Sequence, residues 1–328
     1  MGRRRSLWES LETEALHSKS AGLDRLSARA LLELLSREDR RAVAAVEATA
    51  PAIARAALAL ARVLSGGGRV FFVGAGTSGR LGILEAAECP PTFGTDPERI
   101  VGLMAGGGGA VFRAVEGAED RETDGKRFLQ SRRLSRKDLV VGISASSVTP
   151  FVRGALGFAR ERSASTILVT CATRGPRRLA DIVVAARVGP EVLAGSTRMK
   201  AGTATKLMLN RMTLLAMIRL KKVYGPYMVA LRPGSAKLRY RAKRMIASLG
   251  AVDERRAEGL LEEAGDVKTA VVMARFGVSS REALRRLDRT KGDLRAALSS
   301  AGDRARSRRR PAPARLRAPK RKPRARPS

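Results

Sequence analysis

The sequence predicts an α/β protein: a doubly wound parallel sheet of five strands, preceded by N-terminal helices and followed by a C-terminal helical subdomain. Five short apolar runs alternate with stretches of helical periodicity, as in a sheet whose strands are joined by crossover helices. Each run is continuously apolar rather than alternating, which is typical of strands buried on both faces. The runs are residues 70–73, 100–104, 139–143, 166–170 and 182–185.

Helical patterns occupy the chain before the first strand. Residues 23–36 open a helix with Ser27 as the expected N-cap, and residues 38–64 form a longer Ala-, Val- and Leu-rich pattern interrupted only by Pro51. Ser-Gly-Gly-Gly at 65–68 should end this second helix. We expect four parts: an N-terminal helical segment (1–64), an α/β domain (65–230), a C-terminal helical subdomain (231–300) and a disordered basic tail (301–328).

A glycine-rich turn at residues 74–79 joins the first strand to a helix. Gly76 and Gly79 let the backbone adopt positive φ and approach a ligand closely. Thr77 and Ser78 place hydroxyls beside the unpaired N–H groups of the helix start. Such a turn suits a phosphate or another small anion. The alternative is an ordinary strand-to-helix turn, which a lone glycine-rich segment does not exclude.

The helix after this turn carries Glu85 and Glu88 one turn apart, and Cys-Pro-Pro at 89–91 is expected to end it. Three further segments bring polar side chains to predicted strand ends or helix starts. They are 114–120 with Glu116 and Glu119 at helical spacing, 143–150 with Ser144, Ser146, Ser147 and Thr149, and 195–205 with Ser196, Arg198 and Lys200. Each segment alone is equally typical of turns, helix caps or solvent-facing glutamates. Their order along one α/β chain is what indicates a site.

The chain has a single histidine, His17, and two cysteines, which limits the classes of catalytic and metal site that it can form. Ser-His-Asp catalysis, Cys-His catalysis and His-rich zinc sites would all depend on His17. Cys89 and Cys171 have no metal-ligand spacing, so no metal is expected and proton transfer falls to carboxylates or a lysine. The chain has no run of eighteen apolar residues and no secretory signal, which predicts a cytoplasmic protein without membrane contact.

The formal net charge of +33 is concentrated partly in the tail, where residues 304–328 hold twelve Arg or Lys and five Pro without an acidic residue. This composition cannot build a core and predicts disorder. One interpretation is an electrostatic arm for nucleic acid or another polyanion, although no aromatic residue is present to stack on bases. We favour a solvated extension, because charge runs report partners only loosely.

Three stretches together resemble one known family. GAGTSGRLGILEAAECPPTFG from Gly74, AVEGAED from Ala114 and GSTRMKAGTATKLMLN from Gly195 are similar to the N-acetylmuramic acid 6-phosphate etherase family of the sugar isomerase (SIS) group. The similarity extends from about Thr13 to about Leu298. It implies an SIS-type fold, a homodimer with sites near the subunit interface, and cleavage of the lactyl ether of N-acetylmuramic acid 6-phosphate to N-acetylglucosamine 6-phosphate and D-lactate.

The resemblance also implies residue roles. In the open-chain sugar the C2 proton is α to the C1 aldehyde, so a carboxylate can remove it and the lactyl oxygen on C3 can leave. Glu119 matches the base that removes this proton, and Glu88 matches the acid that protonates lactate and then activates water. No cofactor is implied. The substrate-binding residues are expected to be Gly76, Thr77, Ser78, Gly79, Glu116, Ser144, Ser146, Ser147, Thr149, Ser196, Arg198 and Lys200.

Four positions depart from the family pattern. Ser147 and Val148 replace a glycine and an arginine, His17 replaces an asparagine, and Ala230 replaces an aspartate. The second hypothesis is therefore a non-catalytic sugar-phosphate sensor that resembles the glucokinase regulatory proteins. Retention of Glu88 and Glu119 favours the enzyme, and Val148 favours the sensor.

Overall fold

The computed structural model describes residues 11–172 and 179–299, and it confirms the predicted fold class. Its five strands form one parallel sheet in the order β2-β1-β3-β4-β5. The strands are β1 (Val70–Gly74), β2 (Ile100–Met104), β3 (Leu139–Ile143), β4 (Ser165–Thr170) and β5 (Ile182–Ala185). The predicted apolar runs match these strands to within one residue at each end, because strands buried on both faces are apolar throughout.

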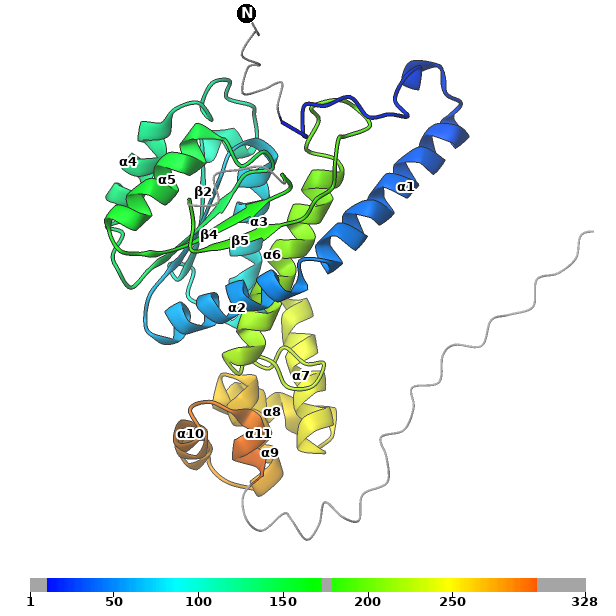
Figure 1. Ribbon diagram of the computed structural model, residues 1–328. Helices are drawn as coiled ribbons and strands as arrows, with labels where there is room; N and C mark the ends of the chain where they lie inside the picture. The colour runs from blue at the N-terminus through cyan, green and yellow to red at the C-terminus, as the bar shows by residue number, and fades with distance from the viewer. Residues whose placement is uncertain (1–10, 173–178, 300–328) are drawn as a thin grey trace, which may run out of the picture.

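Helices cover both faces of the sheet (Figure 1). Phe72 packs in a core with α2 (Ala50–Ser65), α3 (Gly76–Phe93) and α6 (Lys200–Arg219), while α1 (Ala28–Glu47) packs along α6. The preceding side chain of β1, Phe71, points to the opposite face and packs in a second core with α4 (Glu122–Ser131) and α5 (Pro150–Glu161). Both rings are at most 1% exposed, so β1 lies in the middle of a three-layer sandwich.

The N-terminal helices differ from the prediction in where they break. Ser27 caps α1 as expected, its hydroxyl accepting the N–H of Ala30 at 3.3 Å. However, α1 runs without interruption through residue 37 to Glu47, and Pro51 lies in the first turn of α2. A proline is tolerated there because the first N–H groups of a helix have no intrahelical partner. Among the described helices none is long and apolar enough alone to span a membrane; α1 and α2 meet that test only as a pair bent by 61°.

The helix α3 also ends later than predicted. It continues through Pro90 and Pro91 to Phe93, and Gly94 at φ +61° terminates it. Near its start, α3 lies almost against β1, since a Cβ on Gly74 would come within 2.7 Å of the Gly79 nitrogen. Only glycine allows this approach, which brings the first turn of α3 directly to the end of the strand.

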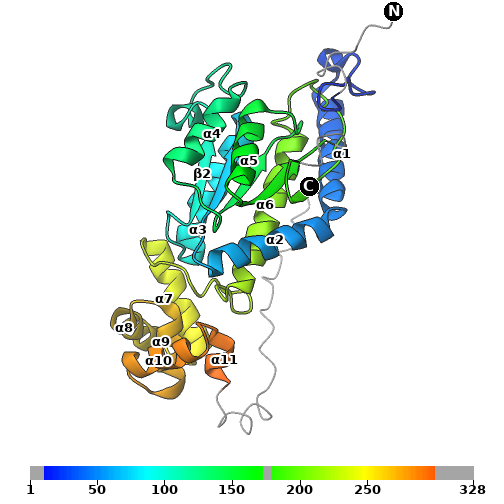
Figure 2. The ribbon, with the colours of Figure 1, turned by 60° about the vertical axis from the view of Figure 1, so that its left-hand side comes forward.

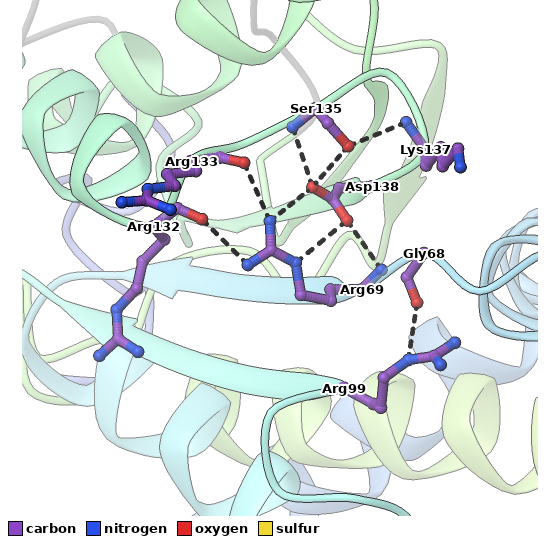
Figure 3. Close-up of polar contacts among 8 residues, drawn as sticks. All are labelled: Gly68, Arg69, Arg99, Arg132, Arg133, Ser135, Lys137 and Asp138. Carbon is purple, nitrogen blue, oxygen red and sulfur yellow. Dashed lines mark hydrogen bonds and ion pairs between the residues drawn. The ribbon is translucent and has the colours of Figure 1, made fainter.

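At the amino-terminal edge of the sheet, a buried carboxylate joins the starts of β1 and β3 (Figure 3). The guanidinium of Arg69 donates to Asp138 through Nε at 3.2 Å and Nη2 at 2.9 Å, and the backbone N–H of Arg69 donates to the same side chain. Ser135 adds its N–H and its hydroxyl. Burial alone would raise the pKa of Asp138, but these donors outweigh it and hold the pKa below its usual range.

The C-terminal helices pack around their own core, apart from the sheet (Figure 2). They are α7 (Ala236–Gly250), α8 (Glu254–Ala264), α9 (Val267–Phe276), α10 (Ser280–Arg289) and α11 (Leu294–Leu298). Ala270 and Val271 of α9 are fully buried at the centre of this core. The residue boundaries between the four parts stay a prediction, and the basic tail lies outside the described residues.

Candidate active site

The ends of three neighbouring strands bring the predicted site segments together. Gly74 at the end of β1 is level with Met104 of β2 and Ile143 of β3. The turn at 76–79 and the loop at 144–149 therefore leave the same carboxyl edge of the sheet side by side. In open parallel sheets ligands bind beyond this edge.

A cavity of about 180 Å³ lies at this edge, between the start of α3, the end of β2 and the turn at 110–119. Glu116, Glu119 and Gly76 all line it. Two predicted site carboxylates therefore lie beside the first turn of α3 (76–79), which is the predicted anion site and is called the anion seat below. The lining residues are Gly76, Arg80, Met104, Ala105, Ala110, Ala114, Val115, Glu116, Ala118 and Glu119.

Arg80 fixes one wall of the cavity, although it was not among the predicted site residues. Its Nε donates to the carbonyl of Val111 and its Nη2 to that of Ala110, each at 2.8 Å. These bonds tie α3 to the short helix η3 (Gly108–Val111). The sequence places Arg80 two residues after Ser78, but nothing local shows that it holds a backbone thirty residues away.

Glu116 and Glu119 lie in a turn, not on a helix as their spacing suggested. Gly117 between them has φ +71°, and α4 begins only at Glu122. Positive φ interrupts helical geometry, and glycine supplies it without steric cost. Both carboxylates are exposed to solvent at the cavity.

The start of α3 has the features of an anion site. No side chain caps it among the described residues, and its N-cap Ala75 cannot do so. Its first N–H groups therefore remain for a ligand, next to the half-buried hydroxyl residues Thr77 and Ser78. The predicted residues Gly76, Thr77, Ser78 and Gly79 all belong to this first turn.

The adjoining loop supplies further hydroxyls. Ser144 and Thr149 form a mutual hydrogen bond with their oxygens 2.7 Å apart, and Ser144 is 2% exposed. Ser147 is also buried and has φ +66°, a conformation that glycine adopts more easily. The hydroxyl of Ser146 accepts the N–H of Val148, whose side chain is buried.

The third predicted segment reaches the site differently. Ser196 and Arg198 precede α6, and a Cβ on Gly202 in its first turn would lie 3.5 Å from the methyl group of Thr77. Lys200, however, is 3% exposed through its side chain and does not line the cavity. Its ammonium instead lies 2.6 Å from Oε2 of Glu38 on α1. The segment is therefore adjacent to the anion site, while its lysine points into the protein.

Glu88 is exposed and does not line the cavity. It lies twelve residues after Gly76 on α3, a rise of about 18 Å along the helix. Within one chain, then, Glu88 and Glu119 do not share the cavity.

Glu85, one turn before Glu88, is 8% exposed and accepts a hydrogen bond from the Asn210 amide of α6. Burial raises its pKa. The sequence separation of these two residues explains why the pairing was not predicted.

Comparison with known proteins gives two results. A family profile for the glucokinase regulatory protein N-terminal SIS domain matches residues 52–160, about a third of the chain. A relative from Gloeobacter violaceus named N-acetylmuramic acid 6-phosphate etherase is 53% identical over 266 residues, which cover 80% of this chain and 87% of the relative. Proteins of the same name from Synechococcus sp. and Mycolicibacterium smegmatis are 48% and 43% identical, covering 89% of this chain and 93% and 98% of their own.

Proposed function

The chain belongs to the N-acetylmuramic acid 6-phosphate etherase family, and we propose that it cleaves the D-lactyl ether of N-acetylmuramic acid 6-phosphate, giving N-acetylglucosamine 6-phosphate and D-lactate. This reaction would recycle amino sugars of the cell wall. The observation that carries the proposal is the cavity in which Glu119 lies beside the uncapped start of α3.

The 6-phosphate binds at the first turn of α3, where backbone N–H groups and the hydroxyls of Thr77 and Ser78 meet. The loop of Ser144 and Thr149 lies beside it. Gly76 allows close approach because its φ is +53° and no atom lies within 4 Å of a Cβ placed there. This arrangement orients the open-chain sugar toward the cavity.

Glu119 removes the C2 proton, and the electron pair of the C–H bond moves onto the C1 carbonyl. When the carbonyl re-forms, C2 and C3 become doubly bonded and the C3–O bond to lactate breaks, with its electron pair leaving on the lactyl oxygen. Glu88 donates a proton to that oxygen. Water, deprotonated by Glu88, then adds to C3 while Glu119 returns its proton to C2, so both carboxyl groups return to their starting states.

We propose a homodimer, because Glu88 is exposed in one chain and a second copy could enclose it. Leu84, one turn before Glu88, is 47% exposed, and Leu214 and Ile218 of α6 are 47% and 45% exposed. The hydrogen bond between Glu85 and Asn210 shows that these stretches of α3 and α6 are adjacent. A second copy covering this apolar surface would exclude water around Glu88 and bring its carboxyl group to an interface.

A non-catalytic sugar-phosphate sensor is the second candidate, and the profile match to a glucokinase regulatory domain favours it. That match covers residues 52–160, whereas the etherase relatives cover at least 80% of the chain. The position of Glu119 in the cavity also favours the enzyme. We further propose a cytoplasmic location, supported by two cysteines that remain free thiols.

Lactate release decides between the two candidates. The full-length protein is incubated with N-acetylmuramic acid 6-phosphate, and D-lactate and N-acetylglucosamine 6-phosphate are measured over time. The enzyme forms both products in equal amounts, and it does so poorly from the sugar that lacks the 6-phosphate. A sensor would bind the sugar phosphate in a titration but release no lactate.

A further inference from the structure

A buried charged cluster joins three parts of the chain next to the start of α6. The Nζ of Lys200 lies 2.6 Å from Oε2 of Glu38, and Nε2 of His17 lies 3.2 Å from Oε1 of the same carboxylate. These three side chains are 3–4% exposed, so they are screened from water. Arg41, 61% exposed, closes the cluster from the surface by donating to Glu38 at 2.6 Å.

A second carboxylate occupies the helix start itself. Glu191 accepts the N–H of Ala201 at 2.9 Å and that of Lys200 at 3.3 Å. The partial positive charge of the α6 terminus is therefore already matched by a side chain of this protein. In this respect α6 differs from α3, whose first turn has no side-chain cap among the described residues.

The cluster is connected to the candidate active site through packing. Thr77 of the anion seat lies against Gly202, two residues after Lys200. On the other side, the thiol of Cys171 donates to the carbonyl of Ala201 at 3.5 Å, while its backbone N–H donates to Ala145 at 3.0 Å. A displacement of the α6 start would thus reach both phosphate-binding segments.

His17 is suited to hold Glu38 without carrying a charge. Its Nδ1 accepts the backbone N–H of Lys19 at 3.2 Å, so in the neutral imidazole the proton is on Nε2, which faces Glu38. A side-chain amide also offers an N–H donor. An asparagine at this position could therefore also donate a hydrogen bond to Glu38.

We propose that Lys200, Glu38 and His17 are positioning residues: together they fix the start of α6 against Thr77 and the 144–149 loop, and Lys200 does not contact the substrate. The inference rests on the proposed function only for its kinetic readout. Removing one partner of a buried ion pair leaves the other charge without compensation, whereas removing both charges together is far less costly. This difference supplies the test.

Lys200→Met, Glu38→Gln and the double variant are compared in full-length protein. Each single variant should lower kcat/KM about tenfold or more, chiefly through KM, and the neutral pair should recover most of that loss because neither charge of the Lys200–Glu38 pair is left without the other. In the double variant the side-chain amide that replaces the Glu38 carboxylate still accepts from His17. If the double variant is folded but as deficient as Lys200→Met, the lysine charge acts on the substrate and the proposal is overturned.

Hydrogen exchange of the backbone amides at 196–203 gives a readout that does not depend on activity. Protection there should fall in both single variants and return in the double variant. Unchanged protection in the single variants contradicts a positioning role even if the parent protein releases no lactate. Absence of lactate from the parent, by contrast, rejects only the proposed function.

His17 provides an independent comparison if the buried-charge variants fail to fold. His17→Asn keeps a donor for Glu38 and should retain kcat/KM within about threefold, while His17→Leu should lose protection at 196–203 and raise KM. Equal behaviour of the two variants overturns the role given to His17. Val271→Ala, buried in the separate C-terminal core, is the matched control: it lowers stability but should leave KM unchanged.

Discussion

The backbone N–H of Phe151 donates to the carbonyl oxygen of Glu119 at 2.9 Å. Phe151 lies in the first turn of α5, directly after the loop that carries Ser144 and Thr149, and its ring is fully buried. The backbone of the proposed base is thereby attached to the end of a proposed phosphate-binding loop. One backbone hydrogen bond therefore joins the turn of Glu119 to the 144–149 loop, so these two segments of the candidate site do not move independently.

We predict that Glu119→Gln abolishes proton abstraction while it preserves the turn. Exchange of the C2 proton with solvent deuterium and lactate release should both fall by about a hundredfold or more, the usual scale for losing a general base. Glu116→Gln is the comparison for a carboxylate in the same turn and cavity that is expected to bind the sugar rather than to remove its C2 proton. Exchange at the parental rate in Glu119→Gln would reject Glu119 as the base.

Ser78→Ala should weaken binding of sugar 6-phosphates. A charge-assisted hydrogen bond contributes about 1.5–3 kcal/mol, so the dissociation constant should rise roughly ten- to a hundredfold. Calorimetric titration with N-acetylglucosamine 6-phosphate measures this. Ser65→Ala, at the exposed end of α2, should have no effect. Equal affinity of the Ser78 variant and the parent would place the phosphate elsewhere.

The sequence was sufficient for the strands but less so for helix ends. Continuous apolar runs locate strands buried on both faces, because few other elements so short are buried on every side. Prolines were misleading in both places where they decided a boundary. Pro51 starts α2 rather than interrupting it, and Pro90 lies inside the last turn of α3. At Pro51 the missing N–H costs no hydrogen bond, because the first N–H groups of a helix lack partners, and this is known only once the helix start is known.

The contacts around the candidate site could be predicted from the sequence where they are local, and they were missed where they join distant residues. The glycine turn at 74–79 indicates an uncapped helix start from six consecutive residues. By contrast, Lys200 contacts Glu38, 162 positions away in the sequence, and Asn210 contacts Glu85, 125 positions away. No periodicity links such pairs, so a basic residue beside a predicted site was assigned to the ligand although it completes a buried ion pair.

Asp138→Asn should destabilise the protein in a pH-dependent way. Because the folded-state pKa of Asp138 is lowered, its contribution is complete above its usual pKa and is lost as pH falls through the folded value. At pH 7 the variant should lose about 3–5 kcal/mol of unfolding free energy, the range for breaking a buried ion pair. Urea unfolding of both proteins from pH 7 to pH 3 measures this. The difference in unfolding free energy between the two proteins should become smaller below about pH 4. A difference that stays constant contradicts the ionic role of Asp138.

Leu214→Glu should separate the proposed dimer. An exposed leucine on a monomer surface tolerates a charge, but a leucine covered by a second copy does not, because the carboxylate would be buried without a partner. Sedimentation velocity should give a dimer for the parent and a monomer for the variant. Leu32→Glu on α1, where the leucine is 63% exposed, is the control for charge alone. A dimeric Leu214→Glu protein would show that the subunits meet elsewhere.

Glu88→Gln separates the two proton transfers of the proposed reaction. The amide is nearly isosteric and cannot donate a carboxylic proton, so departure of lactate should slow by about a hundredfold or more. Glu119 remains in its own cavity, which Glu88 does not line, and C2 exchange should therefore persist after lactate release has collapsed. Deuterium incorporation at C2 and lactate release, measured on the same samples, give the ratio of proton exchange to ether cleavage.

Glu85→Gln is the control one turn away, and it should lower both rates equally, if at all, through its contact with Asn210. Equal loss of exchange and cleavage in Glu88→Gln would mean that Glu88 holds the sugar in place, and full lactate release would remove it from the mechanism.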